Sequence, residues 1–283
     1  MLLVNDVTKQ IIYSRGKNAT TSIADPLQAK DPDWYIPKDI NSFPFPYDPY
    51  REYTCHIVFR QPYERYISGL LEDLSMLMMN SALDLKYYQK IINDNDQAVI
   101  DTKTISNGRT AVLVVDKTED YFLHLFQQIL KYNGYDFGFG DSYHMSNWLW
   151  HGFALQSICD KTIWIDLPNL DQYMLKHFDL ELEHLNVKSP RDKTILKTAI
   201  GKTPRYKDPI DNYLRNENAL YDIIMEHRNE DFTLKDLNDY PGDAQKISDA
   251  VYNLYSETKN TTAKESMLRQ FIWLIFQKHW RQN

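Results

Sequence analysis

The sequence is poor in cysteine, holds fewer basic than acidic residues and lacks a long apolar run. Only Cys55 and Cys159 are present, so the fold needs no disulfide framework and a reducing, cytoplasmic location is expected. The formal net charge is −7 at pH 7, which argues against broad nucleic-acid binding, since that activity normally needs a basic surface. Any site for an anionic ligand must therefore be local.

The sequence also lacks the features that direct a chain to a membrane. Its first residues do not combine a basic segment with an apolar run, so no secretory signal peptide is expected. The most apolar stretch, FIWLIFQKHW from Phe271, is too short to cross a bilayer and is expected to form a buried or docking helix. We therefore expect no membrane span, whereas the oligomeric state stays open.

Short runs rich in Ile, Val and aromatic residues alternate with longer amphipathic runs, which is typical of an α/β fold with a parallel sheet flanked by helices. Strands are predicted at 9–14, 55–60, 110–116 and 161–167, and helices at 63–79 and 118–132. The segment from Ala24 to Tyr53, rich in proline and aromatic residues, is expected to be an ordered loop.

Domain organisation is predicted from the break in the chain after Tyr240. The residues PGD stand there, and two further helices are expected at 244–256 and 263–279. We expect one α/β domain over residues 1–240 and a C-terminal helical extension over 241–283 that packs on the same domain.

A first informative stretch, YSRGKNATTSI at 13–23, directly follows an apolar pair. It combines cations, a glycine and hydroxyl groups: Arg15, Gly16, Lys17, Thr20, Thr21 and Ser22. Cationic side chains, a backbone that turns freely and hydroxyls are what a phosphate group needs around it. This stretch therefore predicts a phosphate site.

A second stretch, VFRQPYERYISGL at 58–70, places a strand end at Arg60 and a proline in the first turn of the next helix. Arg65 and Ser68 then lie three residues apart, on one helical face. The planar guanidinium group suits a phosphate because it forms two parallel charge-assisted hydrogen bonds. An ordinary solvated helix start fits the same residues, so it is the pairing with the first stretch that favours a phosphate site.

Together the two stretches resemble sulfotransferases that use 3′-phosphoadenosine 5′-phosphosulfate (PAPS). RGKNATTS is similar to their 5′-phosphosulfate loop, and FRQPYERYISG is similar to their 3′-phosphate motif. Their order along the chain fits the Golgi-type carbohydrate sulfotransferases and their bacterial and viral relatives. Gly16 and Asn18 depart from the usual proline and hydroxyl residues, but the lysine and the later hydroxyls are kept.

The resemblance continues less specifically to about residue 235, in GDSYHMSNW, KTIWIDLPNLDQYML, EHLNVKS and the segment that begins GKTPRYKD. It implies a P-loop-like sheet, PAPS as the donor, no metal, and transfer of a sulfuryl group to a hydroxyl acceptor. We expect the acceptor to be a carbohydrate, as a glycan or a glycolipid, while a small metabolite and a protein tyrosine stay open.

The resemblance also implies roles for individual residues. Lys17 is the implied catalytic cation, and Arg60 and Ser68 bind the 3′-phosphate with Arg65 nearby. The implied contacts of the 5′-phosphosulfate are Arg15, Gly16, Lys17, Asn18, Ala19, Thr20, Thr21 and Ser22. A lid over the donor is implied for Lys202, Thr203 and Arg205, although a basic surface loop fits those three residues equally well.

The general base that accepts the proton of the acceptor hydroxyl is less defined. Histidine and carboxylates are the usual choices, and the nominees are Asp33, Asp39, Asp48 and His144. We favour His144 narrowly and keep Asp39 as a second catalytic candidate. The aromatic residues from Trp34 to Tyr53, together with Trp148 and Trp150, are candidates for stacking against a sugar ring, although such residues are more often core.

Two other functions are weighed against this one. The residues AIGKT resemble the end of a kinase P-loop, but the position that needs the first glycine of that motif holds Leu196. The second alternative is a nucleotide-binding module that keeps the fold without catalytic activity, and only an assay of turnover separates it from an enzyme.

Overall fold

The computed structural model describes residues 2–14, 19–37, 50–79, 100–104, 110–114, 119, 122–123, 149–183, 190–235 and 240–257. The chain divides into two compact units, each assembled from segments that are distant in the sequence. The first unit comprises Met1–Arg65, Ser146–Asn186 and Leu214–Asn283. The second comprises Tyr66–Met145 and Val187–Tyr213.

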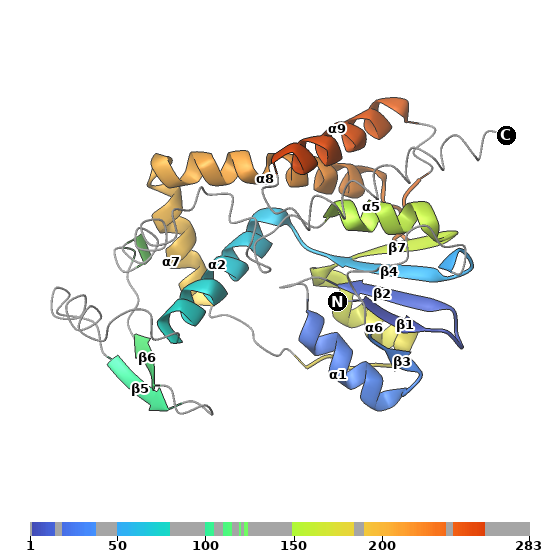
Figure 1. The fold of residues 1–283 in the computed structure, drawn as a ribbon, viewed down its shortest axis with the longest axis horizontal. Coiled ribbons are helices and arrows are strands. Elements are labelled where there is room, and N and C mark those ends of the chain that lie inside the picture. Colours follow the sequence, from blue (N-terminus) through green and yellow to red (C-terminus); the bar gives the residue numbers. More distant parts are fainter. Residues whose placement is uncertain are drawn as a thin grey trace. The chain divides into compact units, whose positions relative to one another are not determined.

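The first unit contains a five-stranded mixed sheet with the order β3-β1-β2-β4-β7 (Figure 1). The strands are β1 (Leu2–Asn5), β2 (Gln10–Ser14), β3 (Trp34–Tyr35), β4 (Thr54–Phe59) and β7 (Lys161–Asp166). Three strands predicted from the sequence, β2, β4 and β7, are confirmed and are parallel to one another. The chain is therefore an α/β protein.

The expectation of a wholly parallel sheet is wrong at β1, which runs antiparallel to both β2 and β3. A connection as short as the one from β1 to β2 permits only antiparallel pairing, because a parallel crossover needs a dozen or more residues. The Asn5 side chain fixes this turn, since its Oδ1 accepts hydrogen bonds from the backbone N–H groups of Val7 and Thr8. Lys9 completes the turn with a positive φ of 55°.

The two faces of the sheet are buried under different helices. On one face, helices α1 (Thr20–Lys30) and α6 (Leu170–Phe178) pack against Ile12 and Val58. On the other, α5 (Leu149–Ile158), the later turns of α8 (Pro204–His227) and α9 (Pro241–Glu257) share a core with the strands. Figure 1 shows α1 and α5 on opposite sides of the sheet. The helix that follows β2 and the helix that precedes β7 therefore lie on opposite faces.

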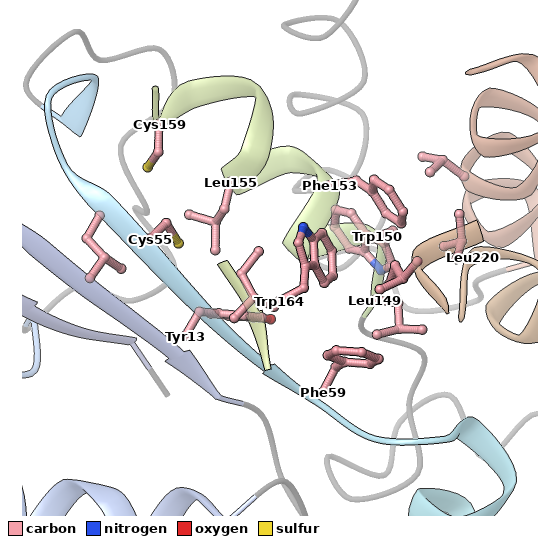
Figure 2. Packing of buried hydrophobic residues seen from close by; sticks show 14 of the residues in the cluster. Tyr13, Cys55, Phe59, Leu149, Trp150, Phe153, Leu155, Cys159, Trp164 and Leu220 are labelled. Carbon is pink, nitrogen blue, oxygen red and sulfur yellow. The ribbon is translucent and has the colours of Figure 1, made fainter. Parts of the chain in front are cut away.

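Trp164 of β7 is the largest fully buried side chain in the core under α5. Its ring makes an edge contact with Phe59 at 5.9 Å between centroids and a tilted contact with Phe153 at 5.0 Å (Figure 2). The indole Nε1 donates a hydrogen bond of 2.9 Å to Gln156 Oε1, so this buried polar group is satisfied. Cys55 and Cys159 are free thiols in the same core.

The outer edge of β7 is covered by the segment that follows α8. The N–H of Trp164 donates to the carbonyl of Phe232 at 2.6 Å, and Arg228 Nη1 donates to the carbonyl of Trp164 at 3.1 Å. Arg228 also donates to Asp166 Oδ1 at 2.6 Å. The backbone of Trp164 is therefore hydrogen-bonded on the side of the strand that faces away from β4.

The second unit contains most of α2 (Pro62–Met79), a two-stranded antiparallel sheet and α7 (Pro190–Gly201). The small sheet pairs β5 (Ile100–Thr104) with β6 (Thr110–Val114). The strand predicted at 110–116 therefore exists, but it belongs to a local antiparallel pair and not to the parallel sheet. The pairing partner of β6 is β5, which is close to it in the sequence. The residue composition of a strand does not reveal which strand it pairs with.

The remaining predicted elements have different outcomes. Helix 63–79 is confirmed by α2 and helix 244–256 by α9. Of the helix predicted at 118–132, residues 119, 122 and 123 are helical, and the rest lies outside the described residues, as does 263–279.

The loop expected from Ala24 is wrong at its start, because α1 continues through Pro26 to Lys30 and β3 follows. Ile23, Ala24 and Leu27 pack together against the sheet, and their burial outweighs the backbone hydrogen bond that a proline inside a helix cannot donate. Residues 38–49 of the expected loop lie outside the described residues. No helix among the described segments has both the length and the apolar character that a bilayer span requires.

We predict that Gly152→Ala destabilises the protein by about 1–3 kcal/mol, because a Cβ there overlaps the Trp164 ring. The added carbon would lie 2.7 Å from Trp164 Cζ3 and closer still to Cη2, and this ring is fully buried. Gly242→Ala is the matched control, since nothing lies within 4 Å of its Cβ position in α9. Urea unfolding measures both variants, and equal stabilities would contradict the packing described for Gly152.

Candidate functional site

The two stretches predicted to bind phosphate follow neighbouring parallel strands. β2 pairs with β4 in a register that sets Tyr13 opposite Ile57 and Ser14 opposite Val58. β2 ends at Ser14 and β4 ends at Phe59, so the residues after them leave the same edge of the sheet. The structure therefore brings the end of β2, the end of β4 and Arg60 to one edge of the sheet.

β2 ends at Ser14 and α1 begins at Thr20, so few residues separate the strand from the helix. The Oγ atoms of Ser14 and Thr20 lie 3.3 Å apart, so the last residue of the strand contacts the first residue of the helix. Ala19 adopts a left-handed conformation, with φ 59° and ψ 25°, directly before α1. The first turn of α1 contains no acidic residue, and Ser22 in that turn is buried. An anion at this helix end would meet no opposing carboxylate from the first turn of the helix.

The residues at the centre of this loop are outside the part of the chain that the structure describes. They are Arg15, Gly16, Lys17 and Asn18, together with the side chain of Thr21. Their roles stay predictions from the sequence.

Arg60 directly follows β4 and is only 15% exposed. Its Nη2 lies 3.7 Å from Glu64 Oε2, one helical turn further along the chain. Desolvation lowers the pKa of the Arg60 guanidinium, the Glu64 carboxylate opposes that shift, and the charge of Arg65 adds to it. A guanidinium group that is shielded from water is strongly stabilised by a nearby anion.

Arg65 has a different environment from Arg60. Its guanidinium Nη2 donates to Glu217 Oε2 at 2.6 Å, and the two side chains are 2% and 1% exposed. The other oxygen of Glu217 accepts from the backbone N–H of Leu149, the first residue of α5, at 3.3 Å. Arg65 therefore joins α2 to α8 and α5 through a compensated charge, and its predicted place in donor binding stays a prediction.

Glu217 is a residue of this region that reasoning from the sequence missed. It lies on the buried face of α8, in helical spacing with Leu214 and Leu220. A carboxylate within an apolar stripe is a sign of a buried ionic partner, because such a group is rarely buried unpaired. That signal was present in the sequence, although it does not say which arginine is the partner.

The remaining residues assigned to the donor are placed as follows. Ser68 is buried on α2, one turn after Arg65. The implied lid is the junction between α7, which ends at Gly201, and α8, which begins at Pro204, so no extended loop lies there.

The three implied lid residues each bind a neighbour. Lys202 Nζ pairs with Glu119 at 2.9 Å, and Thr203 Oγ1 donates to the carbonyl of Ala199 at 2.9 Å. Arg205 Nη2 donates to Tyr206 Oη at 2.7 Å. Their part in donor binding stays a prediction.

Of the four nominated bases, only Asp33 is described by the structure. It is exposed, and its backbone N–H donates to Asp31 Oδ1. Asp39, Asp48 and His144 lie outside the described residues. The choice between His144 and Asp39 therefore stays open.

His56 of β4 is a buried histidine that was not nominated. It is 5% exposed, and its Nδ1 forms a 2.9 Å hydrogen bond with Tyr173 Oη. Desolvation above all, and then the charges of His177 and Lys161, lower the pKa of its imidazole to about 3. Such a group is neutral at ordinary pH and shielded from water, so it belongs to the core and not to the candidate site.

The third parallel strand also ends in a polar residue at the same edge. Asp166 closes β7 opposite Phe59, and it accepts hydrogen bonds from Arg228 at 2.6 Å and from Asn169 Nδ2 at 2.8 Å. Within the described ranges, no three histidine, cysteine or acidic side chains gather as a metal site would require.

Comparison of the chain with protein-family models, with curated proteins and with solved structures finds no match. The functional conclusion therefore depends on the residues themselves and on the sheet edge that brings them together.

We predict that Glu217→Met destabilises the protein by about 3–5 kcal/mol, because it leaves the Arg65 charge buried without its partner. The double variant Arg65→Met/Glu217→Met removes both charges and is expected to regain most of this loss. Urea unfolding followed by circular dichroism compares the three proteins. A double variant as unstable as the single one would show that the pair contributes more than charge compensation.

His56 gives a prediction for the pH dependence of stability. Its neutral form is favoured in the folded state, so protonation below the ordinary pKa of 6.5 favours the unfolded chain. The lowered pKa leaves stability unaffected above pH 6.5 and reduces the free energy of unfolding as the pH falls toward 3. At pH 5 this reduction is about 2 kcal/mol. His56→Gln is expected not to show this reduction. If the free energies of unfolding of the two proteins change in parallel between pH 7 and pH 5, the role assigned to His56 is wrong.

Proposed function

We propose that the protein transfers a sulfuryl group from PAPS to a hydroxyl acceptor, with a carbohydrate as the expected acceptor class. The observation that carries the proposal is the parallel pairing of β2 with β4. Because of this pairing, RGKNATTS and Arg60 leave the same edge of one sheet. Two groups of residues predicted to bind phosphate, following neighbouring strands, suit a nucleotide that carries phosphate at both its 5′ and its 3′ position.

The topology supports a nucleotide at this edge. In open α/β sheets, ligands bind beyond the carboxyl ends of adjacent strands whose connections lead to opposite faces. β2 leads to α1 on one face, whereas α5, in the connection from β4 to β7, lies on the other face. We take the finer P-loop-like description of the fold as part of this proposal, with the turn from Ser14 to Thr20 as its phosphate loop.

Sulfuryl transfer needs positioning and charge stabilisation more than covalent participation by the protein. The acceptor oxygen attacks sulfur, the bond from sulfur to the 5′-phosphate oxygen breaks, and adenosine 3′,5′-bisphosphate leaves with the electron pair. The hydroxyl proton passes to the general base, for which His144 and Asp39 are the nominees. Lys17 balances the charge that develops on the leaving phosphate.

The 3′-phosphate is assigned to Arg60, which has little water around it and a loose ion pair. The role of Ser68 stays as the resemblance implies it, because Ser68 belongs to the second unit. Arg65 is assigned a supporting role, because its charge is compensated by Glu217 at 2.6 Å. The different roles proposed for the two arginines follow from their different carboxylate partners. The sequence motif alone does not distinguish the two arginines.

Donor recognition is tested by comparing adenosine 3′,5′-bisphosphate with AMP in calorimetry. The wild-type protein is expected to prefer the bisphosphate, and Arg60→Ala is expected to weaken it by about ten- to several-hundred-fold with little change for AMP. This selectivity follows because only the bisphosphate offers Arg60 a 3′-phosphate.

The control is Arg51→Ala, since Arg51 is 60% exposed and lies 3.5 Å from the equally exposed Asp160. Equal losses for both ligands, or none for either, would contradict the assignment of Arg60. Selective binding of the bisphosphate without transfer of labelled sulfate to any glycan would instead favour the non-catalytic nucleotide-binding module.

A further inference from the structure

The Arg60–Glu64 contact is looser than the buried ion pairs of the same unit. Its nitrogen–oxygen distance is 3.7 Å, whereas Arg65–Glu217 and Arg228–Asp166 both measure 2.6 Å. Charge-assisted hydrogen bonds are normally about 2.7–2.9 Å long, so Arg60 and Glu64 attract each other without a close hydrogen bond. An anion with better geometry could replace such a partner.

The two partners also differ in their freedom to move. The Glu64 side chain is 38% exposed, against 15% for Arg60. The backbone of Glu64 is held, because its N–H donates to Gln61 Oε1 at 2.7 Å in the first turn of α2. The Glu64 carboxylate is therefore the more solvated of the two partners, and it can turn toward water without a movement of the helix backbone.

Arg60, in contrast, depends on an anion nearby. Its desolvation lowers its pKa, and the neighbouring Arg65 charge acts in the same direction. Glu64 is the carboxylate whose charge opposes both effects. A phosphate that displaced Glu64 would supply the same compensation with more charge and shorter hydrogen bonds.

We infer that Glu64 is a specificity-determining residue that competes with the 3′-phosphate of the nucleotide for Arg60. This inference rests on the proposed function. Without a nucleotide, the Glu64 carboxylate pairs with Arg60, and it rotates toward solvent when the 3′-phosphate binds. The donor PAPS and the product adenosine 3′,5′-bisphosphate both carry this phosphate. The return of Glu64 to Arg60 therefore favours dissociation of the product, a step that limits turnover in many enzymes.

The test is Glu64→Gln, which removes the charge and keeps the shape of the side chain. Calorimetry is expected to show adenosine 3′,5′-bisphosphate binding about two- to fivefold more tightly than to the wild type, with AMP unchanged. Glu64→Ala, which removes the carboxyl group altogether, is expected to shift the affinity in the same direction. The matched control is Glu226→Gln, an exposed glutamate on α8, which should alter neither affinity.

Each other outcome overturns the inference in a distinct way. Weaker bisphosphate binding by Glu64→Gln would make Glu64 a residue that positions Arg60, and unchanged binding would remove it from donor recognition. In both cases a wild-type preference for the bisphosphate over AMP leaves the proposed function standing. A wild-type protein without that preference would overturn the proposed function and this inference together.

Discussion

The parallel alignment of β2 with β4 is the constraint on which the candidate site depends. A slip of one residue would turn the side chains of β2 to the opposite faces of the sheet, so burial on both faces holds the register. Ile11 and Tyr13 face the core under α5, and Ile12 faces the core under α1. This register is what sets Ser14 beside Val58 and brings the residues that follow each strand to one edge.

Three arginines of the first unit show how burial and partner geometry separate structural charges from those able to bind a ligand. Arg65 is 2% exposed and has a short bond to Glu217, so removal of either partner would leave a buried charge. Arg228 is 12% exposed and binds both Asp166 and a strand carbonyl. Arg60 is similarly shielded, but its carboxylate partner is distant and half-exposed. Of the three, Arg60 has the environment most suited to exchanging one anion for another.

The sequence predicted the elements that bury a regular apolar pattern, namely β2, β4, β7, α2 and α9. It did not predict that α1 continues through Pro26, because the contacts that hold this helix on the sheet are tertiary. At the candidate site, the motif identified Arg60 and Arg65 as a pair but not their different partners, since Glu217 is distant in the sequence. The predicted roles of Lys17 and His144 rest on the resemblance alone, since both lie outside the described residues.

The covering of β7 has a consequence for the behaviour of the protein at high concentration. An exposed strand edge offers unpaired N–H and C=O groups to which another chain can add a strand, which is a common start of aggregation. At Trp164 both groups are already taken, by the carbonyl of Phe232 and the guanidinium of Arg228. At the opposite end of the sheet, β3 has two residues and offers little length for such pairing. The segment after α8 thus leaves no free backbone group at Trp164 for a strand of another molecule to pair with.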